Sequence, residues 1–150
     1  MGKLEQGFSE GDPVGPLVKE ITQEAINLFE GSAGHSEPSQ FTDEEAARET
    51  LGTSGTVASG RMSISFALEL LRRHFGGDVF NRSGTVDLRF LRPVRPGDTI
   101  TFAGEVTGTS REANGLKVNV KIEAQNQRGD TTGVGSGSAV VPQAYLPPEE

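Results

Sequence analysis

Histidine titrates nearer to neutral pH than any other side chain, and this chain has two, His35 and His74. His35 stands in the segment GHSEPSQF, residues 34–41, which has turn chemistry around its proline and predicts an ordered loop. His74 follows two arginines at the end of a predicted helix, where positive side chains suit the helix dipole. We interpret His74 as a contact at the helix end and keep His35 as the candidate for proton transfer.

Other kinds of site are excluded or find no support in the sequence. The chain has no cysteine, which rules out disulfides, thiolate catalysis and cysteine-ligated metals. Its histidines are isolated and its carboxylates are scattered, so their spacing predicts no metal site. The Glu44-Glu45 pair follows Thr42 in the pattern of a capping box with Thr42 as the N-cap. We interpret this pair as capping rather than as an acid/base pair.

Length and charge bound the remaining possibilities. At 150 residues the chain is expected to form one domain, residues 1–150, with a flexible arm at 1–11 and a tail at 142–150. The net charge of −7 argues against a nucleic-acid or anionic-membrane surface, since both need clustered Lys and Arg. The N-terminus has no signal-peptide pattern, and no apolar run approaches the roughly 20 residues that span a bilayer. We therefore expect a soluble, cytoplasmic protein.

The elements that flank the His35 loop are predicted to be helical. Thr22 is a suitable N-cap for a short helix over 23–30, and the capping box begins another helix that ends near Gly52. From 62 to 75 the apolar residues recur at helical spacing, which predicts the longest and most apolar helix. Residues 12–19 carry two prolines and a glycine, and they predict an edge strand or an extended lead-in.

After these helices the apolar period changes to two, which predicts strands. The expected strands cover 85–90, 99–108, 117–124 and 131–141. In the last strand Gly133, Gly135 and Gly137 share one face, and a face of such small residues indicates that another backbone packs closely against it. We assign this contact to the 62–75 helix. Helices followed by a run of strands predict an α+β fold whose sheet wraps around the central helix.

Four stretches resemble the MaoC-like branch of the hot-dog superfamily, whose best-known members are (R)-specific enoyl-CoA hydratases and 3-hydroxyacyl dehydratases. They are ITQEAINLFEGSAG, GHSEPSQFTDEEAA, GTVASGRM, and FLRPVRPGDTITFAGEVT with the NQRGD that follows it. The resemblance runs from about residue 12 to residue 141 and so covers most of the chain. It implies a hot-dog fold, in which an antiparallel sheet wraps a central helix, and an acyl thioester as the ligand.

The resemblance also implies where a reaction would take place. The family's active loop uses an acid and, five residues later, a histidine, which together hold and activate the water that adds to an enoyl thioester. In this chain His35 stands at the acid's position, Gln40 at the histidine's position and Glu37 at an asparagine position, while Pro38 matches. Glutamine does not titrate, so His35, assisted by Glu37, is the candidate general base, and Gln40 contributes hydrogen bonds only. The alternative is that His35 is an inert loop residue.

Other residues correspond to contacts that the family makes with its substrate. Gly60 precedes the central helix, where the matching backbone N–H helps to hold the thioester carbonyl; alternatively it serves only the turn. Ser59 adds a hydroxyl donor or caps the helix. Arg89, Arg92 and Arg95 surround one strand–turn corner and are the candidates for the phosphates of coenzyme A, with solvated surface arginines as the alternative.

Three functions remain open from the sequence. The first is a hydratase or dehydratase that acts on an enoyl or 3-hydroxyacyl thioester through the substituted loop. The second is a non-catalytic partner subunit of a heteromeric MaoC-like dehydratase, because the usual titratable pair is lost. The third and weakest is a hot-dog thioesterase, for which no clear nucleophile is present. The resemblance implies a homodimer or higher even oligomer, or a heteromer with a second MaoC-like chain. It implies no cofactor beyond coenzyme A or an acyl carrier protein as part of the substrate.

Overall fold

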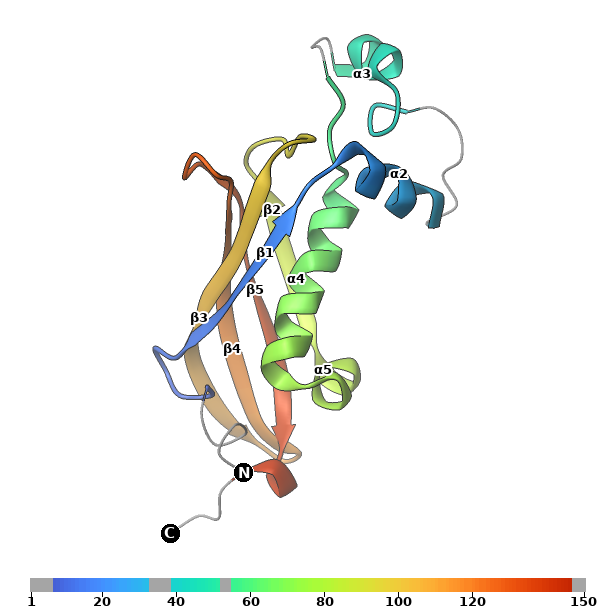
Figure 1. Ribbon diagram of the computed structural model, residues 1–150. Helices are drawn as coiled ribbons and strands as arrows, with labels where there is room; N and C mark the ends of the chain where they lie inside the picture. The colour runs from blue at the N-terminus through green and yellow to red at the C-terminus, as the bar shows by residue number, and fades with distance from the viewer. Residues whose placement is uncertain (1–6, 33–38, 52–54, 147–150) are drawn as a thin grey trace.

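The computed structural model describes residues 7–32, 39–51 and 55–146. One antiparallel sheet of five strands, in the order β1-β3-β4-β5-β2, curves around the long helix α4 (Figure 1). In chain order the elements are β1 (Pro13–Glu20), α2 (Gln23–Ser32), α3 (Glu44–Leu51), α4 (Gly60–Phe75), α5 (Gly77–Ser83), β2 (Thr85–Phe90), β3 (Thr99–Glu112), β4 (Gly115–Gln125), β5 (Thr131–Pro142) and η1 (Gln143–Tyr145). The predicted α+β arrangement, a sheet wrapped around a central helix, is confirmed.

The core lies between α4 and the concave face of the sheet. The helix begins after Ser59, which caps it, and ends at Gly76, whose φ of 90° is readily adopted only by glycine. Leu70, Leu71 and Phe75 are buried on α4 and belong to one cluster with the inward-facing residues of β3 and β4. Burying one such side chain stabilises a fold by about 1.5–3 kcal/mol. The apolar stripe of the helix therefore holds it in place inside the sheet.

The glycines of β5 pack differently from the prediction. A Cβ at Gly137 would lie 2.5 Å from Leu71 Cδ1, so this glycine does face α4 as expected. A Cβ at Gly135 would instead overlap the carbonyl oxygen of Asp87 in the neighbouring strand β2, and Gly133 also lies against the backbone of that strand. The predicted contact of Gly133 and Gly135 with the helix was wrong. At Gly135, the absence of a side chain instead allows the backbone of β2 to approach closely.

Two details of the helices also differ from the prediction. The sequence predicts no helix after Gly76, yet Gly77–Ser83 form α5, in which the Phe80 ring stacks on Phe75 with centroids 6.4 Å apart. A helix of seven residues is marginal by itself, so tertiary packing decides its formation. The side chain that caps α3 belongs to Asp43, whose Oδ2 accepts a hydrogen bond from the Ala46 N–H at 3.0 Å. The assignment of Thr42 as this N-cap was wrong.

Phe8 and Leu146 pack into the core, although they fall within segments predicted to be a loose arm and a tail. Phe8 is only 5 % exposed and stacks on Phe75, and Leu146 is buried in the same cluster. His74 Nε2 lies 2.6 Å from the carbonyl oxygen of Gly7. Because a carbonyl can only accept, the ring nitrogen must donate, so His74 holds this N-terminal segment. None of the helices formed by the described residues is long and apolar enough to cross a membrane.

Candidate functional site

A pocket of about 340 Å³ lies where the N-terminal end of α4 meets the end of β2. It is lined by Ala58, Ser59, Gly60, Ser63, Phe90, Leu91, Arg92, Pro93 and Val94. Its walls are joined by a hydrogen bond of 2.7 Å from the Ala58 N–H to the Val94 carbonyl. Three residues singled out from the sequence, namely Ser59, Gly60 and Arg92, therefore meet in one pocket, which we take as the candidate site.

Gly60 is the first residue of α4, and two features of it matter for the site. It does not have a positive φ, so the turn itself does not require glycine. The ring of Phe90 covers it: a Cβ at this position would lie 2.7 Å from Phe90 Cε2, so the ring would have to move. The Gly60 N–H lies in the first helical turn, and no acceptor for it occurs among the described residues. This donor at the positive end of the helix dipole suits an anion or an acyl oxygen.

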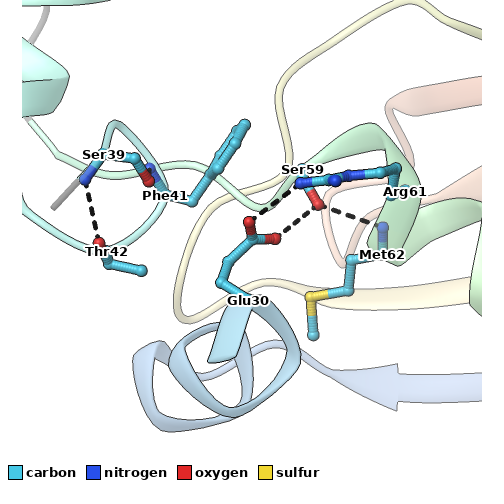
Figure 2. A network of polar contacts seen from close by, with 7 residues as sticks. All are labelled: Glu30, Ser39, Phe41, Thr42, Ser59, Arg61 and Met62. Atoms are coloured by element: carbon cyan, nitrogen blue, oxygen red, sulfur yellow. Dashed lines mark hydrogen bonds and ion pairs between the residues drawn. The ribbon is translucent and has the colours of Figure 1, made fainter. Parts of the chain in front are cut away.

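A buried carboxylate stands behind the Ser59 wall of the pocket (Figure 2). Glu30, on α2, is 0 % exposed, and its Oε2 accepts a hydrogen bond of 2.9 Å from Ser59 Oγ. Its Oε1 lies 3.2 Å from Arg61 Nη2, which supplies a positive charge. Such partners are required, because an unpaired buried carboxylate would be strongly destabilising. Sequence reasoning missed Glu30, although it follows the inward-facing Ile26 by four residues and so shares the buried face of the helix.

Ser59 both caps α4 and binds Glu30, so the capping role proposed for it is confirmed. Its Oγ accepts a hydrogen bond of 3.3 Å from the Met62 N–H while it donates to the carboxylate. The same hydroxyl therefore connects α2 to the start of α4 and contributes to the pocket wall.

The three arginines proposed to bind phosphates do not share one pocket. Arg92 lines the pocket beside Gly60. Arg89 lines a separate hollow formed by β2 and β5. Arg95 lies in a third hollow, where its guanidinium donates to the carbonyl oxygen of Gly55 at 3.3 Å and so braces the loop that leads into α4. Only Arg92 is therefore brought together with the residues at the start of the helix.

The predicted catalytic loop falls only partly within the described residues. His35 and Glu37 lie outside them. Gln40 is half-buried, and its backbone carbonyl accepts a hydrogen bond of 3.1 Å from the Val57 N–H, but it does not line the pocket. Within 7–32, 39–51 and 55–146, no three His, Asp or Glu side chains gather in a way that would hold a metal ion. The carboxylate joined to the pocket wall is instead that of Glu30.

Comparison with known proteins identifies similar folds along most of the chain. The family model described as "MaoC like domain" matches residues 9–127. A monoamine oxidase regulatory protein from Archaeoglobus fulgius is 27 % identical, with a TM-score of 0.77 over 92 % of this chain and 95 % of that one. An (R)-hydratase from A. caviae involved in PHA biosynthesis is 20 % identical, with a TM-score of 0.72 over 91 % of this chain and 99 % of that one.

A truncated HadBC complex from Mycobacterium tuberculosis, a 3R-hydroxyacyl-ACP dehydratase, is 18 % identical, with a TM-score of 0.65 over 87 % of this chain and 95 % of that one. None of the curated protein sequences compared with this chain matches it. The structural matches and the family model agree on the hot-dog fold expected from the sequence, which is thereby confirmed.

Proposed function

The chain belongs to the MaoC-like family, and we propose that it is a hydratase or dehydratase that acts on an enoyl or 3-hydroxyacyl thioester of coenzyme A or an acyl carrier protein. The observation that carries this proposal is the Gly60 N–H, a helix-terminal donor in a pocket at the start of the central helix. Water adds to the double bond of an enoyl thioester because the thioester carbonyl withdraws electrons. A fixed donor at the carbonyl oxygen stabilises the negative charge that develops there.

The other residues of the pocket suit the remaining parts of such a substrate. The half-exposed side chains of Phe90 and Leu91 offer apolar surface for an acyl chain, and Arg92 offers a cation for the phosphates of the carrier. A volume of about 340 Å³ is at the small end of ligand pockets. We therefore propose short acyl chains as the first substrates to test.

The base of the proposed reaction remains the one predicted from the sequence. His35 corresponds to the acid of the family's loop, and we propose that it takes the proton, with Glu37 assisting and Gln40 positioning the water or thioester. General-base catalysis typically contributes ~10²–10⁴-fold, so His35→Ala should lower kcat by about that factor while changing KM little. Gln40→Ala should cost less, because an amide can only orient its partners.

The experiment that tests the function is hydration of crotonyl-CoA, and of longer and branched enoyl-CoAs, by the purified chain. Loss of the absorbance of the conjugated thioester reports the reaction. Gly60→Ala should lower kcat/KM, because its methyl group would displace Phe90 from the pocket wall. Gly77→Ala is the matched control, because a Cβ there meets no atom within 4 Å. Absence of hydration both alone and with a partner chain would contradict the proposal.

A second candidate is a non-catalytic partner subunit, and one residue favours it. Gln40, at the position of the family's histidine, does not titrate. The similar HadBC structure is that of a complex, so a heteromer is the natural form of this alternative. It predicts that the chain alone is inactive and that a second MaoC-like chain with an intact acid and histidine restores activity. In that case His35→Ala in this chain would leave the activity of the pair unchanged.

We also propose that the chain assembles through an edge of its sheet, as a homodimer or with a related chain. The strands β1 and β2 are the two edges, and an unpaired edge favours association with another strand. Next to the β2 edge, Phe90 and Leu91 are 48 % and 50 % exposed, which adds apolar surface. Light scattering should give at least twice the mass of the 15.9 kDa chain. A stable monomer at micromolar concentration would contradict this assembly.

A further inference from the structure

The direction of the Ser59 hydroxyl proton follows from its two partners. A hydroxyl has one donor and two lone pairs, whereas a carboxylate only accepts. The Ser59 proton must therefore point to Glu30 Oε2, 2.9 Å away, and one lone pair receives the Met62 N–H at 3.3 Å. No further donor to this oxygen occurs in the part of the chain that the structure describes. Ser59 is only 3 % exposed but lines the pocket, and the one polar capacity of its hydroxyl not used by these two partners is its second lone pair.

We propose that Glu30 acts through Ser59 to make the pocket wall a hydrogen-bond acceptor, and that the pocket thereby selects acyl thioesters with a hydroxyl at C3 over those with a carbonyl there. This inference rests on the proposed function, in which the Gly60 N–H holds the thioester oxygen. A 3-hydroxyl donates its proton to Ser59 Oγ. A 3-oxo group has no proton to donate, so its lone pairs face those of Ser59.

Glu30 is a positioning residue in this arrangement, since it is fully buried and does not itself line the pocket. Arg61 Nη2 lies 3.2 Å from its Oε1, while its Oε2 accepts from Ser59 (Figure 2). The donor of Gly60 and the acceptor of Ser59 are adjacent in the chain. They match a ligand whose oxygen at C1 accepts a hydrogen bond and whose hydroxyl at C3 donates one. In the hydration direction the attacking water would take the place of the 3-hydroxyl.

Glu30→Gln gives a test that keeps the shape of the side chain and reverses the polarity. Arg61 has only donors, so the single oxygen of the new amide should face Arg61, and its NH₂ group should face Ser59. Ser59 must then accept from that NH₂, which turns its own proton toward the pocket. The wall becomes a donor, and a 3-oxo ligand gains a hydrogen bond that it could not make before.

The experiment measures equilibrium binding of three thioesters, namely (R)-3-hydroxybutyryl-CoA, acetoacetyl-CoA and butyryl-CoA. The wild type should bind the hydroxy ligand about tenfold more tightly than the oxo ligand, because one gained and one frustrated hydrogen bond are worth about that factor. Glu30→Gln should abolish or reverse this preference. Ser59→Ala should bind both ligands like butyryl-CoA, and Ser59→Thr should restore the preference. Glu69→Gln makes the same chemical change on an ion-paired carboxylate of α4, away from the pocket, and should keep the wild-type preference.

The outcomes separate this inference from the proposed function. If butyryl-CoA binds but Glu30→Gln keeps the wild-type preference, the inference is overturned and thioester binding stands. If the wild type binds none of the three ligands, the proposed function fails and the inference fails with it. If circular dichroism shows that Glu30→Gln does not fold, Ser59→Ala decides the question. A tenfold preference retained in Ser59→Ala would overturn the inference.

Discussion

A titratable side chain lies at each end of α4, namely Glu30 of α2 at its start and His74 in its last turn, and the two have different kinds of partner. At the N-terminal end, the Glu30 carboxylate accepts from Ser59 and Arg61, and the Gly60 N–H is available at a pocket. At the C-terminal end, the His74 ring donates to the Gly7 carbonyl and packs edge-on against two phenylalanine rings. The N-terminal end of the helix therefore presents several hydrogen-bond donors, whereas the C-terminal end is packed mainly against aromatic rings.

This difference follows from the helix itself. The first turn leaves N–H groups without intrahelical partners and carries a partial positive charge, so it suits an acyl oxygen. The last turn leaves carbonyl groups, which offer such a ligand no donor. In this molecule Phe75 lies in the last turn, and its ring is stacked between those of Phe8 and Phe80. A titratable residue near a helix end therefore does not by itself indicate a ligand-binding site. Its hydrogen-bond and packing partners decide whether it can contribute to one.

The largest effect that we expect is at the apolar end. Phe75 is almost fully buried, so Phe75→Ala should lower the free energy of unfolding by about 3–5 kcal/mol, measured by urea denaturation. Thioester binding by the fraction that remains folded should be unchanged. Phe90→Ala is the matched variant at the other end, where the ring is half-exposed and should affect binding more than stability. A cost below about 1 kcal/mol for Phe75→Ala would show that the aromatic stack does not hold that end.

A smaller loss is expected where the middle of α4 meets the sheet. Gly137→Ala would place a Cβ 2.5 Å from Leu71 Cδ1, an overpacking that should cost roughly 1–3 kcal/mol. Gly133→Ala is the control from the same strand, because its Cβ would lie at 3.4 Å from the nearest atom. Thermal denaturation of both variants measures the difference. Equal melting temperatures would contradict the assignment of Gly137 as the close contact with the helix.

The two ends can be compared directly by removing one hydrogen-bonding side chain from each. Ser59→Ala removes an N-cap and a donor to Glu30, and should cost about 1–2 kcal/mol. His74→Phe keeps an aromatic ring but loses the donor to Gly7, and should cost about 1 kcal/mol. Only Ser59→Ala should change the preference between 3-hydroxy and 3-oxo thioesters. The same change in preference in His74→Phe would remove the distinction between the ends.

The smallest effect concerns Glu69, which lies between the two ends on α4. The hydrogen bond from Lys19 lowers the pKa of Glu69 below its ordinary value, burial opposes this, and Arg73 adds to the lowering. A lowered pKa in the folded state stabilises the fold above the ordinary value of about 4.3, and this stabilisation is lost as the pH falls through the folded pKa. The Glu69→Gln variant should differ from the wild type by less than about 1 kcal/mol at neutral pH. The difference should disappear in acid, and its growth on acidification would contradict this sign.

The sequence by itself determined the features that depend on neighbouring residues. Period-two and helical patterns predicted the sheet and α4. Thr22 was predicted as an N-cap, and its Oγ1 does accept from the Ala25 N–H at 3.0 Å. The Ser59–Gly60 pair was predicted at the start of the central helix, where it is found. These features are local, because a cap or a periodic stripe is specified within one or two turns of chain.

Only the tertiary structure decided which distant groups become partners. Glu30 and Ser59 are 29 residues apart, and nothing in the local pattern of α2 predicts which donor its inward-facing carboxylate accepts from. The tertiary structure likewise places the three arginines in different hollows. It also brings the backbone of β2 close to Gly135. The physical reason is that a charged group buried in the core must be satisfied by whatever the fold brings within about 3 Å, and this depends on how helices and strands pack rather than on their own sequence.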